Sequence, residues 1–246
     1  MKTSWQNVHK WYNDKVGSEG HDYHQEVIFP NLLKKLTKEP LVDFACGQGI
    51  LGRKISPDMR YAGYDIAPSF IKLAQKGDGS AHHAYFVQDC TLLIKTKGDY
   101  KQATCILAAQ NIENLPGLLA NAKNQLLSGG KFHLVLNHPC FRIPRQSSWG
   151  EDSEKKIQYR RLDRYMSPLK IPIQTHPGKG EKSPETWSFH SSLMDFMKPF
   201  WMAGFTLSNL EEWVSHKESQ GGKAKMENRA REEFPLFLYL EFTKMA

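Results

Sequence analysis

Three aspartates, each inside or at the end of an apolar run, are the residues of this chain whose types and spacing point most directly to chemistry. Asp43 lies within the run 41–44, Asp65 ends the run 61–65, and Asp89 lies near the end of the run 84–90. The carboxyl ends of parallel strands meet at one edge of a sheet, where carboxylates accept hydrogen bonds from ligand hydroxyl and amino groups. The spacing therefore predicts a ligand site at such an edge.

A glycine-rich turn follows the first of these runs. Gly47, Gly49 and Gly52 form the pattern G-x-G-x-x-G, which is typical of dinucleotide-binding turns. Asp43 argues against a dinucleotide, because a carboxylate repels a diphosphate and attracts an ammonium or sulfonium group. We expect a cationic ligand, and an NAD(P)-dependent oxidoreductase is the weaker alternative.

The segment 43–49 resembles the first motif of the class I S-adenosylmethionine (SAM)-dependent methyltransferases, an acidic residue followed by x-G-x-G-x-G. Ala45 replaces the first glycine of that motif. The resemblance implies SAM as cofactor, S-adenosylhomocysteine (SAH) as product, and methyl transfer by in-line displacement. It also implies that Asp65 binds the ribose hydroxyls and Asp89 the adenine amino group. The full set of cofactor contacts that we expect from the central part of the chain is Asp43, Ala45, Cys46, Gly47, Gln48, Gly49, Asp65, Ile66, Asp89, Cys90 and Gln110.

The elements needed to position these residues follow in order along the chain. Strands are predicted over 41–44, 61–65, 84–90, 102–108, 131–137, 204–210 and 234–242, and helices over 69–76, 114–127 and 191–202. With the resemblance, this order predicts an α/β, Rossmann-like, seven-stranded, mostly parallel sheet. Its last strand is antiparallel between the fifth and sixth, and helices cover both faces. We expect one domain, divided into an N-terminal helical cap (1–37), a cofactor-binding half (38–138), a substrate-cap insert (139–190) and a C-terminal part (191–246).

The N-terminal cap is predicted to form two helices, over 5–12 and 23–36, separated by a glycine break. Similar methyltransferases place such helices over the methionine end of the cofactor. Tyr12 and Tyr23 are therefore candidate cofactor contacts and His24 a candidate substrate contact. Packing in the interior is the alternative role for each of them.

The insert carries most of the net charge of +7. Residues 142–183 hold ten Lys or Arg and five Asp or Glu, a net +5. Its aromatic residues argue against disorder, so we expect a cap over the substrate side of the sheet, with Trp149 as a substrate contact. Interleaved basic and aromatic side chains also stack bases and neutralise phosphates. An RNA-modifying methyltransferase is therefore an alternative to an enzyme acting on a small molecule.

The segment 137–141, Asn-His-Pro-Cys-Phe, is the most distinctive local motif in the second half of the chain. It is similar to the Asn-Pro-Pro-Tyr/Phe motif of methyltransferases that act on nitrogen, but it has His138 at the first proline and follows the fifth strand instead of the fourth. We therefore do not predict nitrogen specificity. His138 is a candidate general base. Asn137, Arg142 and Arg145 are candidate substrate contacts, the two arginines for an acidic group.

Composition excludes several other classes of protein. The chain has 246 residues, enough for one α/β domain, and no uncharged stretch near the roughly 18 residues that span a membrane. Its start has no apolar signal core. The four widely spaced cysteines indicate reduced thiols in the cytoplasm and no metal site. We predict a methyltransferase acting on a small molecule, most similar to ubiquinone/menaquinone-biosynthesis-type and general small-molecule enzymes. A non-catalytic SAM-binding module is a further alternative.

Overall fold

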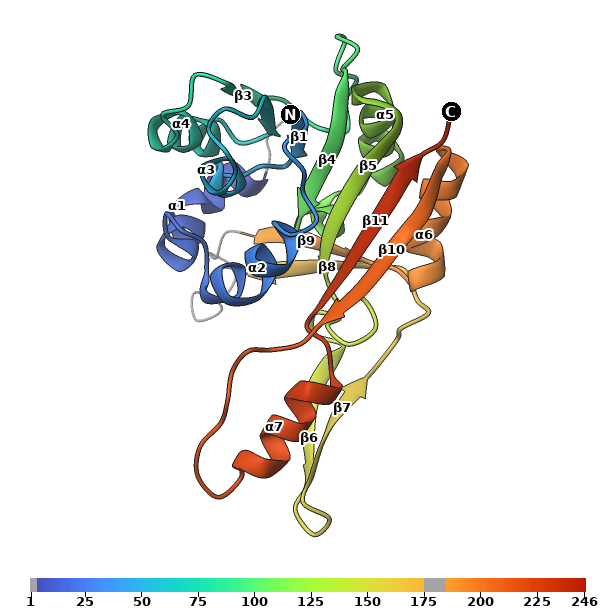
Figure 1. Cartoon of the computed structure of the whole chain (residues 1–246). Coiled ribbons are helices and arrows are strands. Elements are labelled where there is room, and N and C mark those ends of the chain that lie inside the picture. The colour runs from blue at the N-terminus through green and yellow to red at the C-terminus, as the bar shows by residue number, and fades with distance from the viewer. Residues whose placement is uncertain (1–3, 175–184) are drawn as a thin grey trace.

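The centre of the molecule is a seven-stranded sheet with the strand order β10-β11-β5-β4-β1-β2-β3 (Figure 1). The computed structural model describes residues 4–174 and 185–246. Neighbouring strands from β3 to β5 are parallel, and β11 is antiparallel to both β5 and β10. The sheet strands are β1 (Leu41–Phe44), β2 (Tyr61–Asp65), β3 (His83–Val87), β4 (Tyr100–Ile106), β5 (Leu126–Asn137), β10 (Phe205–Trp213) and β11 (Phe237–Lys244). The predicted fold class is confirmed, including the place of the last strand.

Helices cover both faces of this sheet, as predicted. On one face, α5 and α6 bury Leu118, Leu119 and Phe200 against apolar residues of the central strands. On the other face, two smaller clusters join the N-terminal segment, α3 and α4 to the strands. The helical elements are α1 (Ser4–Val16), the π-helical turn η1 (His24–Ile28), α2 (Phe29–Leu32), α3 (Ile50–Lys54), α4 (Pro68–Gly77), the 3₁₀ turn η2 (Ala109–Asn111), α5 (Leu115–Gln125), α6 (Leu193–Met202) and α7 (Ala224–Glu233). Within the two described ranges, no helix is both long and apolar enough to cross a membrane.

Side-chain caps mark the starts of α5 and α6. The Ser192 side chain accepts a hydrogen bond from the Asp195 backbone N–H at the start of α6, and Asn114 caps α5 through the Gly117 N–H. The helix predicted over 23–36 forms as one continuous helical run over 22–32, in which the π-helical η1 leads directly into α2, and it ends four residues earlier than predicted. Pro30 lies in the first turn of α2, directly after the π-helical segment.

Two predicted boundaries also differ from the structure. The third strand ends at Val87, so Asp89 lies in the following turn and not in the strand. The fifth strand begins at Leu126, directly after α5, and includes Gly129 at φ +75°. Glycine adopts this backbone conformation without strain. The Ser-Gly-Gly segment, predicted to end the helix, therefore lies within β5, and the helix α5 already ends at Gln125.

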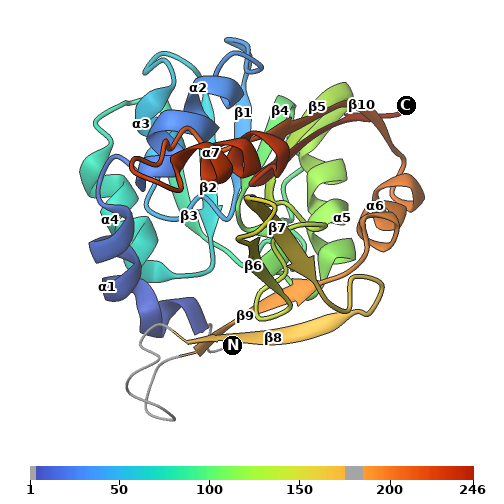
Figure 2. The ribbon, with the colours of Figure 1, turned by 90° about the horizontal axis from the view of Figure 1, so that it is seen from below.

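The insert after β5 forms two separate hairpins in place of a single cap. β6 (Ser147–Asp152) pairs with β7 (Ile157–Leu162), and β8 (Leu169–Gln174) pairs with β9 (Glu185–His190). The first hairpin lies beside α7 in a lobe that projects from the lower end of the sheet (Figure 1). The second lies along one side of the molecule, with β9 close to α1 and η2 (Figure 2). Only the β8–β9 hairpin is placed to cover a ligand.

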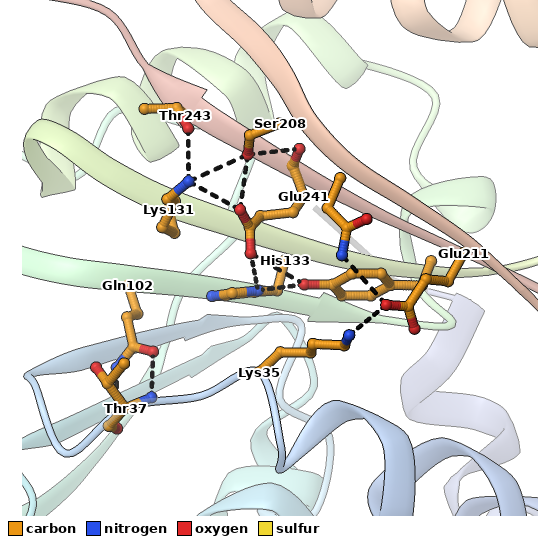
Figure 3. A network of polar contacts seen from close by, with 11 residues as sticks. Lys35, Thr37, Gln102, Lys131, His133, Ser208, Glu211, Glu241 and Thr243 are labelled. Carbon is orange, nitrogen blue, oxygen red and sulfur yellow. Dashed lines mark hydrogen bonds and ion pairs between the residues drawn. The ribbon is translucent and has the colours of Figure 1, made fainter.

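Hydrogen bonds and ion pairs between side chains connect the strands β5, β11 and β10 (Figure 3). On β5, the Lys131 ammonium donates to Glu241 of β11 at 2.8 Å and to Ser208 of β10 at 3.2 Å. His133 Nδ1 lies 2.8 Å from the Tyr239 hydroxyl, and burial lowers the pKa of His133 to about 4. This network ties three strands whose polar side chains share one face of the sheet.

Candidate active site

A cavity of about 520 Å³ opens at the carboxyl ends of β1, β2 and β4, where the sequence predicts a ligand site. Its volume lies within the roughly 300–1,000 Å³ that is typical of small-molecule sites. The strand ends form its floor, and α1 and β9 supply aromatic walls. The lining residues are Trp5, Tyr12, Ala45, Gly47, Asp65, Ile66, Phe70, Asp89, Cys90, Thr91, Leu92, Ile106, Leu107, Ala108, Asn111, Ile112, Glu113, Asn114, Trp187 and Phe189.

Asp65 is the best-positioned polar group of this cavity. One carboxylate oxygen accepts a hydrogen bond from the Gly47 N–H at 3.0 Å, and the other accepts one from the Ala67 N–H at 2.8 Å. Each oxygen keeps one lone pair for a ligand donor. Burial raises the pKa of Asp65 from 3.8 to about 6, and the two backbone hydrogen bonds limit the rise. A rigid carboxylate with two remaining acceptor positions suits a pair of vicinal hydroxyls.

The glycine turn brings the backbone next to this carboxylate. Gly47 and Gly49 have φ of +56° and +73°, and a Cβ on Gly49 would lie 2.8 Å from the Cβ of Ala74. Ala45, which replaces the first glycine of the motif, also has a positive φ of +56°, a conformation that costs about 1–2 kcal/mol for a residue with a Cβ. At the end of β4, Leu107 has a φ of +52° and likewise lines the cavity. Backbone strain of this kind is concentrated at binding sites.

Asp43, predicted as a cofactor contact, is not among the residues that line the cavity. Its carboxylate is 3% exposed and accepts hydrogen bonds from the Tyr61 hydroxyl at 2.8 Å and the Thr104 hydroxyl at 2.7 Å. Burial raises the pKa of Asp43 to about 7, against the effect of these two bonds. Asp43 therefore ties β1 to β2 and β4 beneath the glycine turn, while Asp65 faces the cavity.

Some of the other predicted cofactor contacts line the cavity, and the rest lie in the segments that pack behind it or in a neighbouring cavity. Ile66, Cys90 and Asp89 line the cavity. The Asp89 carboxylate already accepts hydrogen bonds from the Thr91 N–H at 2.9 Å and the Thr91 hydroxyl at 2.7 Å, so it also closes the turn after β3. Gln48 does not line the cavity, because its side chain is buried and donates to the Gly17 carbonyl at 2.7 Å. Cys46 and Gly49 support the turn from outside the lining, and Gln110 lines a neighbouring cavity.

The aromatic roof comes from segments far apart in the sequence. Trp5 and Tyr12 of α1 lie on one side, with ring centroids 6.0 Å apart, and Trp187 and Phe189 of β9 lie on the other. The Lys170 ammonium of β8 lies 5.2 Å from the Trp187 ring centroid and 3.0 Å from the Glu113 carboxylate. The Lys170–Glu113 pair joins the hairpin to the loop after β4 at the solvent-exposed edge of the cavity.

The charges that line the cavity all have one sign. Asp65, Asp89 and Glu113 are acidic, and none of the described lining residues is Lys or Arg. The Gly47 N–H, which a diphosphate would need at this turn, already donates to Asp65. The lining therefore favours a cationic ligand over a dinucleotide. Within the described part of the chain, no group of three His, Cys, Asp or Glu side chains is placed to hold a metal ion.

His138 lies outside the cavity, and the prediction of a catalytic base is not carried forward. Its ring is 2% exposed, with Nε2 2.7 Å from the Glu212 carboxylate and Nδ1 accepting from the Cys140 N–H at 3.2 Å. Nδ1 thus acts as an acceptor and Nε2 carries the proton toward Glu212. Burial lowers the pKa of His138. The ring anchors the start of the insert to β10.

Four further predicted contacts also lie away from the cavity. Tyr23 packs against Phe237 with ring centroids 5.7 Å apart, and His24 packs against Phe29 at 5.8 Å. Burial lowers the pKa of His24 to about 4. The remaining two, Arg145 and Trp149, are exposed and belong to the approach to the first hairpin and to the hairpin itself. Asn137 and Arg142 lie at the smaller cavity beside Gln110.

Several lining residues were not predicted, although the sequence held partial signals for them. Trp187 and Phe189 belong to the aromatic residues of the predicted insert, Trp5 begins the helix predicted over 5–12, and Asn111 follows the predicted fourth strand. No local pattern places β9 beside α1, because that contact depends on how the insert folds.

Comparisons with known proteins support the fold. No protein-family model matches the chain, and no curated protein sequence matches it. Among solved structures, the chain is similar to a SAM-dependent methyltransferase from Mesorhizobium loti, with a TM-score of 0.68, 19% identity, and coverage of 88% of this chain and 97% of that one. A protein from Listeria monocytogenes described as a SAM-dependent methyltransferase matches with a TM-score of 0.68 and 18% identity, covering 89% and 98%.

A glycopeptide N-methyltransferase, MtfA, solved in complex with SAH, matches with a TM-score of 0.58, 13% identity, and coverage of 87% of this chain and 85% of that one. At these identities the similarity shows a shared fold. The Rossmann-like methyltransferase fold, predicted from the glycine turn and the order of the elements, is confirmed.

Proposed function

We propose that this chain is a SAM-dependent methyltransferase that acts on a small-molecule acceptor. The observation that carries the proposal is Asp65, a buried carboxylate with two remaining acceptor positions, set beside a glycine turn in a cavity lined only by acidic charges among its described residues. Vicinal hydroxyls fit the carboxylate, and a sulfonium cation fits the sign of the lining. An NAD(P)-dependent oxidoreductase fits neither the lining charges nor the occupied Gly47 N–H.

The orientation of the cofactor follows from these contacts. Asp65 accepts the ribose hydroxyls, while Ile66 and Asp89 lie on the side where the adenine belongs by resemblance to the methyltransferases. Gly47 and Ala45 lie at the turn, where the methionine part would pass. Tyr12 closes this side, and burial raises the pKa of its hydroxyl to about 12, so that the group remains a neutral hydrogen-bonding partner.

When bound, SAM supplies a methyl group activated by its attachment to sulfonium. The residues of the chain align the two reactants and exclude water, which lowers the entropic part of the barrier. The roof of Trp5, Trp187 and Phe189 excludes water. Asp65 fixes the ribose and with it the direction in which the methyl group points.

Two features favour a small acceptor over RNA. The cavity lies beneath the β8–β9 hairpin and offers apolar aromatic walls of small-molecule size. The basic and aromatic residues of the first hairpin, by contrast, lie in the projecting lobe. There, Arg160 donates to the Phe141 carbonyl and lies 5.0 Å from the Trp149 ring centroid, and Trp149 packs on Phe234. These side chains are engaged in holding the lobe together, and the aromatic cavity suits a ring-bearing acceptor of the kind that quinone-biosynthesis-type enzymes use.

Incubation with SAM carrying a labelled methyl group tests the acceptor class. The purified protein would receive, in parallel, a small-molecule extract and a total RNA fraction from the same cells, with the Asp65→Ala variant as control. We expect label in the small-molecule fraction with the wild-type protein alone. Label confined to RNA would reject the small-molecule acceptor, and no label in either fraction would favour a non-catalytic SAM-binding module.

A further inference from the structure

A second, smaller cavity of about 40 Å³ lies beside the large one at the carboxyl end of β5. Phe189 lines both cavities, and the neighbouring residues Gln110 and Asn111 of η2 each line one of them. This side cavity is lined by Gln110, Leu136, Asn137, Pro139, Arg142, Pro144, Ser188, Phe189, His190, Ser191 and Phe196. A volume of about 40 Å³ holds a few water molecules or one functional group, but not a ring.

Several polar side chains of the side cavity have no hydrogen-bond partner among the described residues, and three of them carry an amide or a guanidinium group. The Gln110 Oε1 atom is buried and unpaired, and the side chains of Asn137 and Arg142 form no hydrogen bond or ion pair with the described part of the chain. His190 of the same lining, in contrast, is bonded to the Tyr165 carbonyl at 2.8 Å. Buried polar groups are normally paired, so the buried Gln110 Oε1 atom, with the partly buried Asn137 and Arg142 side chains beside it, indicates a missing ligand.

The sign of the charge indicates what this ligand is. The Arg142 guanidinium is half-buried, and its nearest described aromatic contact is the Phe237 ring, 5.7 Å away. Burial lowers the pKa of Arg142, and the charge of Arg142 in turn contributes to the lowered pKa of Arg160. Two neighbouring guanidinium groups, neither paired with a carboxylate in the described part of the chain, repel each other and are stabilised by an anion.

We propose that the side cavity binds a carboxylate group of the acceptor substrate through Arg142, with Gln110 and Asn137 as further donors. The inference rests on the proposed function and specifies its substrate class. A carboxylate matches the planar guanidinium fork and the size of the cavity. The Gln110 amide offers an N–H to the anion when it turns by half a rotation, since its O and N atoms occupy equivalent positions.

The two cavities have opposite charges, and this difference orients the acceptor. Asp65, Asp89 and Glu113 line the large cavity and repel an anion, whereas Arg142 attracts one to the side cavity. An acceptor with a carboxylate at one end therefore places that end near β5 and its remaining part across Phe189, toward the methyl group. Arg145, three residues further on, is exposed and lines neither cavity.

Benzoate and its neutral counterpart benzamide serve as probes, measured by calorimetric titration with and without SAH. We expect benzoate to bind the wild-type protein at least about tenfold more tightly than benzamide, because a charge-assisted bidentate pair is worth that much or more. The Arg142→Met variant is expected to lose this preference and to keep its SAH affinity. Arg145→Met is the matched control and is expected to keep both properties.

The Gln110→Glu variant keeps Arg142 in place and therefore tests the site without removing the half-buried guanidinium. Its new carboxylate competes for Arg142 and is expected to weaken benzoate binding by about tenfold or more. Equal binding of benzoate and benzamide, or unchanged benzoate binding in Gln110→Glu and Arg142→Met, would overturn the inference. A wild-type protein that binds benzoate but not SAH would instead reject the proposed function and leave the carboxylate site standing.

Discussion

Replacing Asp65 by alanine removes the one carboxylate on which the assignment of the cofactor depends. Its two oxygens each accept one backbone hydrogen bond, from Gly47 and Ala67, and each has one acceptor position left for a ribose hydroxyl. A hydrogen bond to a charged group contributes about 1.5–3 kcal/mol. Two such bonds correspond to roughly 3–6 kcal/mol, so we expect SAH affinity to fall by about 10²- to 10⁴-fold.

The same substitution is expected to leave the fold intact, because two effects oppose each other. The difference between a pKa of about 6 and the ordinary 3.8 corresponds to about 3 kcal/mol that opposes folding above pH 6. For an acid whose pKa is raised in the folded state, this cost disappears as the pH falls below the ordinary value. Alanine removes the cost at neutral pH, but it leaves the Gly47 and Ala67 N–H groups without their acceptor, at about 1–3 kcal/mol each. Chemical denaturation is therefore expected to show a change in the free energy of unfolding of no more than about 3 kcal/mol.

The pH dependence of binding provides an independent check of the same group. Ribose hydroxyls bind the ionised carboxylate better than the protonated acid, so SAH affinity is expected to fall as the pH falls through about 6. One titrating group gives about a tenfold change for each pH unit below its pKa, so affinity at pH 5 should be about tenfold lower than at pH 7.5. The Asp65→Ala variant should lack this dependence.

Calorimetric titration with SAH at pH 5, 6 and 7.5 measures both effects, with Asp99→Ala as the control. Asp99 is exposed and lies outside the cavity, in an ion pair with Arg60. Its removal should leave SAH affinity within about twofold. Wild-type affinity in the Asp65→Ala protein would refute the ribose assignment, and so would a wild-type affinity that does not change between pH 5 and 7.5.

Four further substitutions separate binding from stability. Gly47→Ala is expected to lower the free energy of unfolding by about 1–2 kcal/mol, because Gly47 has a positive φ. It is also expected to lower SAH affinity sharply, because Gly47 lines the cavity and the new Cβ, which contacts no protein atom, occupies space that the ligand needs. Gly49→Ala is expected to destabilise the fold itself, because its Cβ would lie 2.8 Å from Ala74; denaturation curves and SAH titration of the two variants should differ in this direction. His138→Ala is expected to lower the free energy of unfolding by about 1–3 kcal/mol, because the hydrogen bonds to Glu212 and Cys140 are lost. SAH affinity is expected to remain within about twofold of the wild-type value. A large loss of SAH affinity with an unchanged melting temperature would contradict the anchoring role. Trp187→Ala opens the roof and is expected to reduce acceptor turnover by about tenfold or more with little change in melting temperature, which kinetics with an identified acceptor would check.

The parts of the structure that were predicted correctly depend on local patterns with a direct physical cause. The glycine turn after β1 and the carboxylate that ends β2 are close in sequence, and parallel strands bring their carboxyl ends together. The apolar run at the end of the chain has the strand residues needed for an inner position, and β11 is buried there between β5 and β10. Asp65 and the order of the strands could therefore be read from the sequence.

The predicted site residues that lie outside the large cavity are ones whose direction or partners depend on the folded chain. Asp43 points to the sheet face where Tyr61 and Thr104 lie, and this direction is set by the register in which β1 pairs with β2 and β4. His138 follows a strand as a catalytic base would, but Glu212, which pairs with it, comes from a strand over seventy residues later. Trp149 and Trp187 both lie in the basic insert, and only the pairing of its strands into two hairpins separates the projecting lobe from the roof.

Calorimetric titration of the purified protein with SAH, with NAD and NADP as controls, tests the central proposal most directly. The acid-lined cavity, the Asp65 carboxylate and the occupied Gly47 N–H predict binding of SAH in the micromolar range, roughly −8 kcal/mol, and no binding of either dinucleotide. Binding of NAD or NADP, with no binding of SAH, would contradict the inference that this cavity takes a cationic ligand and would contradict the methyltransferase assignment as well.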